Sequence, residues 1–240
     1  LTAVKVTGIE NALQPAKDGL NTYTVSFAMP AKDVKIAVEL DTVDYKEITI
    51  SGEATKTTEY PAEQVVRVTG NLTLTEGTTI TINGKLVVPA GVTVTVAAGS
   101  KLIINGYADI KGDIVIEEAD SDKKDSAPGE ILVAGNGQAD VFGNVTISGV
   151  IGTEGTGKIV FKSGSAAEVS TGADVSATIS EAGTIYGNVS IEEDASLTVA
   201  GKIGMNANDT TFAVEGTLVV DTVVPTLGFN VDIAKDGQLQ

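Results

Sequence analysis

Apolar and polar residues alternate in short runs along most of the chain, and glycines separate these runs. Strict alternation over about four to eight residues is typical of a β-strand with one buried face. From about residue 63, six such runs follow one another, each after a glycine: Gly77-TTITI, Gly84-KLVV, Gly91-VTVTV, Gly99-SKLII, Gly106-YADI and Gly112-DIVI. The pattern predicts a series of short strands joined by tight turns.

The runs repeat in groups of three. Gly77 and Gly99 are 22 residues apart, and so are Gly84 and Gly106. A unit of three short strands cannot bury its inward side chains alone, so it must stack on copies of itself. We therefore expect an all-β fold, a parallel β-solenoid (β-helix). Val, Ile and Leu would face inward, and glycine would supply the positive φ angles at the corners.

The remaining part of this region follows the pattern less regularly. Residues 117–130, EEADSDKKDSAPGE, show no alternation and are expected to form a loop that leaves one coil. Residues 229–240 are expected to form a last strand or a cap. A pair of β-sandwiches is the alternative architecture, because it is also built from short alternating strands. Looser runs continue to the end of the chain after Gly143, Gly157, Gly187 and Gly216.

The first 60 residues lack the regular glycines. Alternating segments at 4–9, 22–29, 33–40 and 46–52 predict short strands, and 53–62 is expected to be a linker. We therefore predict two parts. Residues 1–60 form a small N-terminal β subdomain or cap, and residues 61–240 form the β-solenoid domain.

Composition argues against several classes of function. The chain has no Cys, no His and no Trp, and Arg67 is its single arginine. The commonest general base, the thiolate metal ligands and paired guanidinium clamps are therefore missing. The 32 acidic residues outnumber the 16 basic ones, and the formal net charge of −16 repels nucleic acid. We expect no enzyme, no nucleic-acid partner and no cofactor, with calcium as the one alternative.

The location is expected to be extracellular, at a cell surface. The most apolar stretch, at 86–99, is interrupted by Pro89 and two glycines, so no membrane insertion is predicted. The chain begins at Leu1 rather than Met, which fits removal of a signal peptide or a trimmed chain. The absence of cysteine is common in secreted surface proteins.

Two segments resemble known families. Residues 23–38, YTVSFAMPAKDVKIAV, resemble the closing strands of the internalin-type B repeat, which carry an aromatic-x-Met-Pro segment followed by Asp-Val. Residues 85–106 resemble the β-solenoid repeats of bacterial and archaeal cell-surface proteins. Both resemblances imply a wall-associated or filamentous context, and neither implies a catalytic site. The residues that match the internalin-type pattern are Phe27, Met29, Pro30, Asp33 and Val34.

Two kinds of candidate site remain. Calcium prefers several oxygen ligands from a flexible loop, and the alternative for the acidic loop is a solvated charged segment. Asparagines in Asn-x-Ser/Thr sequons are candidate glycosylation sites, and chance occurrence in a Thr-rich chain is the alternative. The candidate calcium ligands are Glu117, Glu118, Asp120, Asp122 and Asp125, and the sequon asparagines are Asn71, Asn144, Asn188 and Asn208.

If the chain were an enzyme, a β-solenoid fold would suggest a polysaccharide lyase. Such a site needs carboxylates clustered on one face. The outward carboxylates Asp109, Asp113, Glu130 and Asp140 are not spaced one coil apart in the sequence. We therefore expect a structural protein, a self-assembling subunit of an extracellular filament or surface layer. Its partners would be further copies, bound through strand pairing at residues 1–10 or 229–240. The alternative is an adhesin stalk or a carbohydrate-binding module.

Overall fold

A computed structural model gives the fold of the chain. It describes residues 45–123, 125–169, 183–203, 211–220 and 230–240, together with the backbone of four short strands before residue 45. The chain divides into two compact units, Leu1–Tyr45 and Lys46–Gln240. The described residues form strands, turns and loops, and no helix occurs among them.

The first unit contains two short antiparallel strand pairs. β1 (Ala3–Val6) pairs with β4 (Ile36–Glu39), and β2 (Ala16–Lys17) pairs with β3 (Tyr23–Thr24). Strands therefore lie in three of the segments that the alternation marked. The five residues that match the internalin-type pattern lie outside the described residues.

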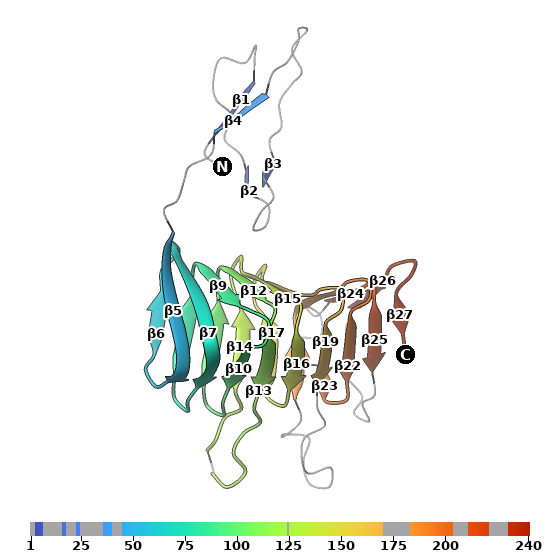
Figure 1. The fold of residues 1–240 in the computed structure, drawn as a ribbon. Helices are drawn as coiled ribbons and strands as arrows, with labels where there is room; N and C mark the ends of the chain where they lie inside the picture. Colours follow the sequence, from blue (N-terminus) through green and yellow to red (C-terminus); the bar gives the residue numbers. More distant parts are fainter. Residues whose placement is uncertain are drawn as a thin grey trace. The chain divides into compact units, whose positions relative to one another are not determined.

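The second unit is a parallel β-solenoid of about seven turns, as the sequence repeat predicted (Figure 1). Each coil contributes one strand to each of three faces, and like strands of successive coils pair in parallel. Face 1 consists of β9 (Lys85–Val88), β12 (Tyr107–Ile110), β15 (Gln138–Val141), β18 (Lys158–Phe161), β21 (Asn188–Ile191), β24 (Thr211–Val214) and β26 (Asn230–Ile233). Face 2 consists of β10 (Thr93–Val96), β13 (Asp113–Ile116), β16 (Asn144–Ile147), β19 (Ala166–Val169), β22 (Ser196–Val199), β25 (Thr217–Val220) and β27 (Gln238–Leu239). Face 3 consists of β6 (Thr58–Tyr60), β8 (Thr79–Ile82), β11 (Lys101–Ile104), β14 (Glu130–Val133), β17 (Val150–Thr153), β20 (Thr184–Tyr186) and β23 (Lys202–Ile203).

Two longer strands form the first coils. β7 (Gln64–Leu74) begins beside β9 on face 1 and ends beside β10 on face 2. β5 (Lys46–Ala54) runs parallel to β7 along both faces, with a bulge between Ile50 and Gly52. β6 pairs with β8 on face 3. The boundary expected after residue 60 therefore lies elsewhere in the structure, because 46–60 pairs with solenoid strands and much of the expected linker at 53–62 is strand.

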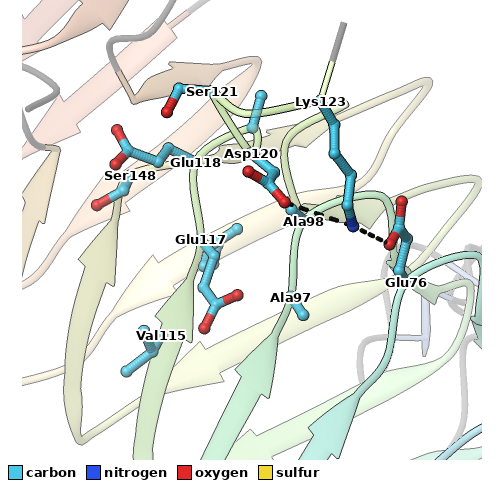
Figure 2. A pocket seen from close by; sticks show the side chains of 12 residues that line it. Glu76, Ala97, Ala98, Val115, Glu117, Glu118, Asp120, Ser121, Lys123 and Ser148 are labelled. Atoms are coloured by element: carbon cyan, nitrogen blue, oxygen red, sulfur yellow. Dashed lines mark hydrogen bonds and ion pairs between the residues drawn. The ribbon is translucent and has the colours of Figure 1, made fainter. Parts of the chain in front are cut away.

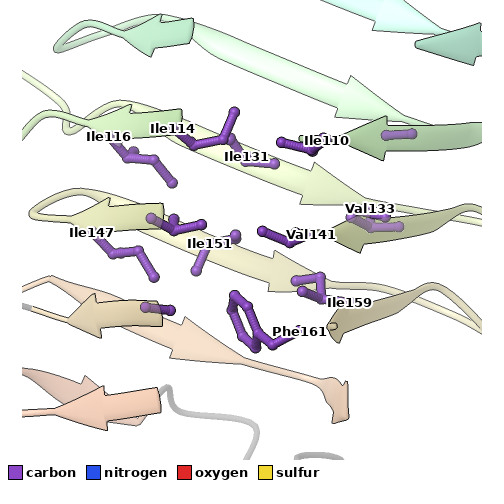
Figure 3. Close-up of a cluster of buried hydrophobic side chains, with 14 of the residues drawn as sticks. Ile110, Ile114, Ile116, Ile131, Val133, Val141, Ile147, Ile151, Ile159 and Phe161 are labelled. Carbon is purple, nitrogen blue, oxygen red and sulfur yellow. The ribbon is translucent and has the colours of Figure 1, made fainter. Parts of the chain in front are cut away.

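The core is a set of apolar columns that run through the coils. Every second side chain of a strand points inward, so paired strands place like positions next to one another. Ile110, Val141 and Phe161 form one such column on face 1, and each is at most 2% exposed (Figure 3). Ile116 and Ile147 pair in the same way on face 2. Burying a side chain of this size contributes about 1.5–3 kcal/mol, so the core holds the coils together.

The corners require glycine for two reasons, a positive φ angle and close backbone packing, and the sequence predicted only the first. Gly77, Gly91 and Gly99 have positive φ angles of 76°, 79° and 71°, as expected. Gly106 and Gly112 do not have positive φ. A Cβ at Gly106 would instead overlap the backbone oxygen of the preceding coil. These corners need glycine because stacked turns approach too closely for a side chain.

The loop after Ile116 and the strands at residues 230–240 lie where the sequence predicted them. Between Ile116 and Glu130 the described residues form no strand and leave the coil as a loop. Residues 230–240 form the last described strands of faces 1 and 2, since β26 pairs with β24 and β27 pairs with β25.

Candidate functional site

The loop at 117–129 covers a groove on the outside of the solenoid. The groove has a volume of about 550 Å³ and lies between this loop, the turn at 97–98 and the outer side of β13. Lys123 Nζ lies 2.6 Å from Glu76 Oε2 and 3.4 Å from Asp120 Oδ2 (Figure 2). These pairs are exposed to solvent, where such contacts contribute about 0–1 kcal/mol each. They connect the loop to a turn two coils earlier in the chain.

The carboxylates expected to bind calcium do not converge. Figure 2 shows Glu117 and Glu118 pointing in different directions, while Asp120 points to Lys123. Asp122 and Asp125 are exposed. Within the residues that the structure describes, no three acidic side chains form a group that holds a metal ion. The amino group of Lys123 lies 3.4 Å from Asp120 Oδ2.

A polar cluster lies on the outer side of face 1, with Asp140 at its centre. Asp140 is only 8% exposed. Tyr107 Oη donates a hydrogen bond to its Oδ2 (2.8 Å), and Gln138 Nε2 donates one to its Oδ1 (2.6 Å). Lys162 Nζ lies 4.0 Å from Asp140 Oδ2 and 2.6 Å from Glu192 Oε1. The cluster therefore links side chains of four successive coils.

The environment of the cluster shifts two pKa values upward. Burial raises the pKa of the Tyr107 hydroxyl, and its hydrogen bond to Asp140 raises that pKa further. The hydrogen bond to Glu192 is the main cause that raises the pKa of the Lys162 amine, with Asp140 adding to it. Both shifts keep the protonated forms that the hydrogen bonds and ion pair require.

Asp109 and Asp140 are adjacent, which corrects an expectation from the sequence. They occupy paired positions of β12 and β15, one coil apart. The spacing in sequence hid this pairing because the loop at 117–129 lengthens the coil between them. Asp109 Oδ2 lies 3.9 Å from Lys111 Nζ, and its Oδ1 is buried without a hydrogen-bond partner. Both oxygens of Asp140 accept a hydrogen bond, Oδ2 from Tyr107 and Oδ1 from Gln138.

Three of the four sequon asparagines lie in the described residues. Asn71 and Asn144 are exposed, whereas Asn188 is half-buried and its Nδ2 donates to Gly157 O at 3.3 Å. Asn71 Oδ1 accepts a hydrogen bond from Thr93 N, and Asn144 N donates to Asp113 Oδ1. These asparagines extend the pairing between coils. Asn208 lies outside the described residues.

The two ends of the solenoid carry apolar side chains and strand edges. In the last described coil, Ile233 is 44% exposed and Leu239 is 49% exposed. At the other end, a cavity of about 450 Å³, here called the N-terminal hollow, lies over the first coil. Among the described strands, β26 and β27 each pair on one edge, and so does β5. The hollow is lined by residues including Ile50, Ala54, Tyr60, Leu72 and Ile80.

Sequence reasoning missed the Asp140 cluster and the N-terminal hollow. Alternation places Tyr107 and Asp109 on the outside of β12, but only the strand register shows which residue lies beside each of them. Residues 46–60 carry no regular glycines, so nothing in the glycine repeat assigns them to the first coil. The exposure of residues 230–240 agrees with their expected place at an end.

Comparison with known proteins does not assign the chain to a family. No family model matches the chain, and no curated protein matches it. Among solved structures, the TibC-catalyzed hyper-glycosylated TibA55-350 fragment is 14% identical, with 83% of this chain and 92% of that chain covered. The TM-score is 0.14, so the two chains do not superpose as one fold and the match carries no conclusion about function. No helix among the described residues is long and apolar enough to cross a membrane.

Proposed function

We propose that this chain is a structural building block of a microbial cell surface, and that copies of it assemble end to end into a filament or layer. One observation carries the proposal. The two ends of the described solenoid carry inward-type apolar side chains beside strand edges: Ile233 and Leu239 are exposed at one end, and Ile50 and Tyr60 are partly buried at the other.

Edges of this kind favour pairing with a further strand. An unpaired strand edge presents backbone N–H and C=O groups to any strand in the right orientation. All described solenoid strands pair in parallel, so a second copy displaced along the solenoid axis presents strands of the required direction. A head-to-tail contact that does not close on itself generates a filament.

The surface location rests on composition and on the resemblance of residues 85–106 to surface repeats. The net charge of −16 and the lack of cysteine suit an exposed extracellular coat. We also propose that the chain has no catalytic activity, because it contains no His and no Cys and has a single arginine. An assay on acidic polysaccharides with added calcium tests this part, and turnover would contradict it.

A carbohydrate-binding adhesin stalk is the second candidate. Phe142 is 40% exposed on the edge of face 1, with Lys111 Nζ 5.9 Å from the centre of its ring. Exposed aromatic rings are the usual platforms for sugars, and the Asp140 cluster beside it adds polar groups. Glycan-array binding that Phe142→Ser abolishes would favour this candidate.

Electron microscopy and light scattering of the purified chain test the assembly. We expect regular filaments from the unmodified chain and monomers from Leu239→Lys, because the lysine places a charge in the proposed apolar contact. Phe142→Ser is the matched control: it removes an exposed apolar side chain from the side of the solenoid and should leave filaments intact. An unmodified chain that stays monomeric at every concentration contradicts the proposal.

A further inference from the structure

We infer that end-to-end assembly has one defined register, in which β26 of one copy pairs with the first half of β5 of the next copy and β27 pairs with its second half. Leu239 then enters the N-terminal hollow above Gly52. This inference rests on the proposed function, and it adds the partner surface and the residues that meet.

The topology of the first coil provides matching edges. Lys46–Ile50 of β5 pairs with Gln64–Val68 of β7, and Gly52–Ala54 pairs with Leu72–Leu74. Because β7 passes from face 1 to face 2, β5 is the first strand of both faces. β26 and β27 are the last described strands of the same two faces. Stacking the last coil on the first coil therefore continues both faces with every strand parallel.

The apolar columns match across this junction. On face 1, Val231 continues the column that begins at Ile48, and Ile233 continues the column that begins at Ile50. Both columns would continue with aliphatic side chains in contact.

On face 2, the column that runs from Gly52 to Leu239 has the best match between its two ends. Leu239 pairs with Leu218 at one end of this column, and at the other end Gly52 pairs with Leu72. Gly52 has no side chain, and apart from its two neighbours in the chain no residue has an atom within 4 Å of the place that a Cβ would take. The N-terminal hollow of about 450 Å³ lies beside Gly52 and is lined in part by Leu72, which is itself only 4% exposed. The half-exposed Leu239 of a second copy supplies the missing side chain.

The outward side chains agree with the same register. Asn230 lies opposite Glu47, Asp232 opposite Thr49 and Gln240 opposite Glu53, so no like charges meet. Amide–carboxylate pairs of this kind already join coils within the chain: Asn83 Nδ2 donates to Glu59 Oε1 at 2.7 Å, and Asn144 Nδ2 donates to Asp113 Oδ1 at 3.3 Å. A shift of two residues toward the start of β5 would place Asp232 opposite Glu47, and like charges directly opposite are unfavourable.

The corners between faces 1 and 2 are excluded from the pairing. β5 turns this corner through Ser51 alone, whereas the last coil turns it through residues 234–237. The inferred junction therefore consists of two strand pairs and the contact of Leu239.

Disulfide trapping tests the register, since the natural chain has no cysteine. Thr49→Cys with Asp232→Cys places the two thiols at opposite ends of one solenoid, so a disulfide between them must join two copies. Paired positions of neighbouring strands lie about 5 Å apart, within disulfide range, whereas a shift of two residues separates the Cα atoms by about 8 Å. Thr49→Cys with Asn230→Cys is therefore the matched control.

Three outcomes are distinguishable on non-reducing gels after mild oxidation of assembled material. Covalent oligomers from Thr49→Cys/Asp232→Cys, and few from the control pair, are the expected result. Filaments that form without cross-linking the first pair, or that cross-link the control pair equally, overturn the inferred register but leave end-to-end assembly in place. Absence of filaments in the unmodified chain overturns the proposed function and this inference together.

Discussion

At the scale of single residues, Asp140 shows how an acidic chain places charge against its core. Its carboxylate is 8% exposed and accepts hydrogen bonds from Tyr107 and Gln138, with Lys162 at 4.0 Å. A carboxylate that loses solvent must recover its interactions from neighbours. Residues of adjacent coils supply them, so this group also joins the coils.

Replacing Tyr107 with Phe tests that role. The change removes one hydrogen bond to a carboxylate, so we expect the free energy of unfolding to fall by about 1–3 kcal/mol near neutral pH. Urea denaturation followed by circular dichroism measures the difference. Tyr45→Phe, at a tyrosine that is 55% exposed, is the control and should change stability little. Equal stability of the Tyr107→Phe variant and the unmodified chain would contradict the role.

The difference in the free energy of unfolding between the unmodified chain and Tyr107→Phe also depends on pH. The raised pKa of Tyr107 means that the folded chain holds this proton more tightly than the unfolded chain does. The stabilisation is therefore complete below the ordinary tyrosine pKa of about 10 and is lost as pH rises above it. We expect the gap between the unmodified chain and Tyr107→Phe to narrow at alkaline pH. Comparing the two chains isolates Tyr107 from Tyr60 and Tyr186, whose pKa values burial also raises.

At the scale of the strand and turn, the corners limit which residues the fold accepts. A Cβ at Gly143 would overlap the backbone oxygen of Gly112 in the preceding coil. Neighbouring coils are held at strand spacing by their backbone hydrogen bonds, so a corner cannot move away alone. The stacking of turns, rather than the conformation of one turn, fixes glycine here.

Alanine substitution separates a crowded corner from an open one. We expect Gly143→Ala to lower the midpoint of thermal unfolding, with a cost of about 1–3 kcal/mol from overpacking. Gly70→Ala is the matched control, because its Cβ would meet only Ser51 Cβ at 3.6 Å, an ordinary contact. That variant should stay within about 0.5 kcal/mol of the unmodified chain. A Gly143→Ala variant as stable as Gly70→Ala would mean that the corners are not held this closely.

The sequence predicted the repeating strands because their signal is local. Alternation and the glycines from Gly77 to Gly112 mark each strand without knowledge of its neighbours. The pairing of Asp109 with Asp140 depends on how many residues the intervening loop adds, and alternation does not reveal that number. The sequence did not predict the first coil for another reason. β5 pairs with β7 with a bulge between Ile50 and Gly52, and it has no glycine repeat.

At the scale of the whole molecule, the first and last coils of the described solenoid differ from the coils between them. Within the body, each described coil covers the apolar side chains of the one before it. Among the described solenoid residues, Leu239 is 49% exposed in the last coil, and the N-terminal hollow lies above Gly52 in the first coil. We propose that one end covers the other, so that copies add along the solenoid axis.

Diffraction from oriented filaments of the purified chain tests this central claim most directly. Stacking along the solenoid axis keeps every strand perpendicular to the filament, so we predict a strong reflection at about 4.8 Å on the meridian, parallel to the filament axis. Filaments with that reflection away from the meridian, or a chain that forms no filaments, would contradict the account.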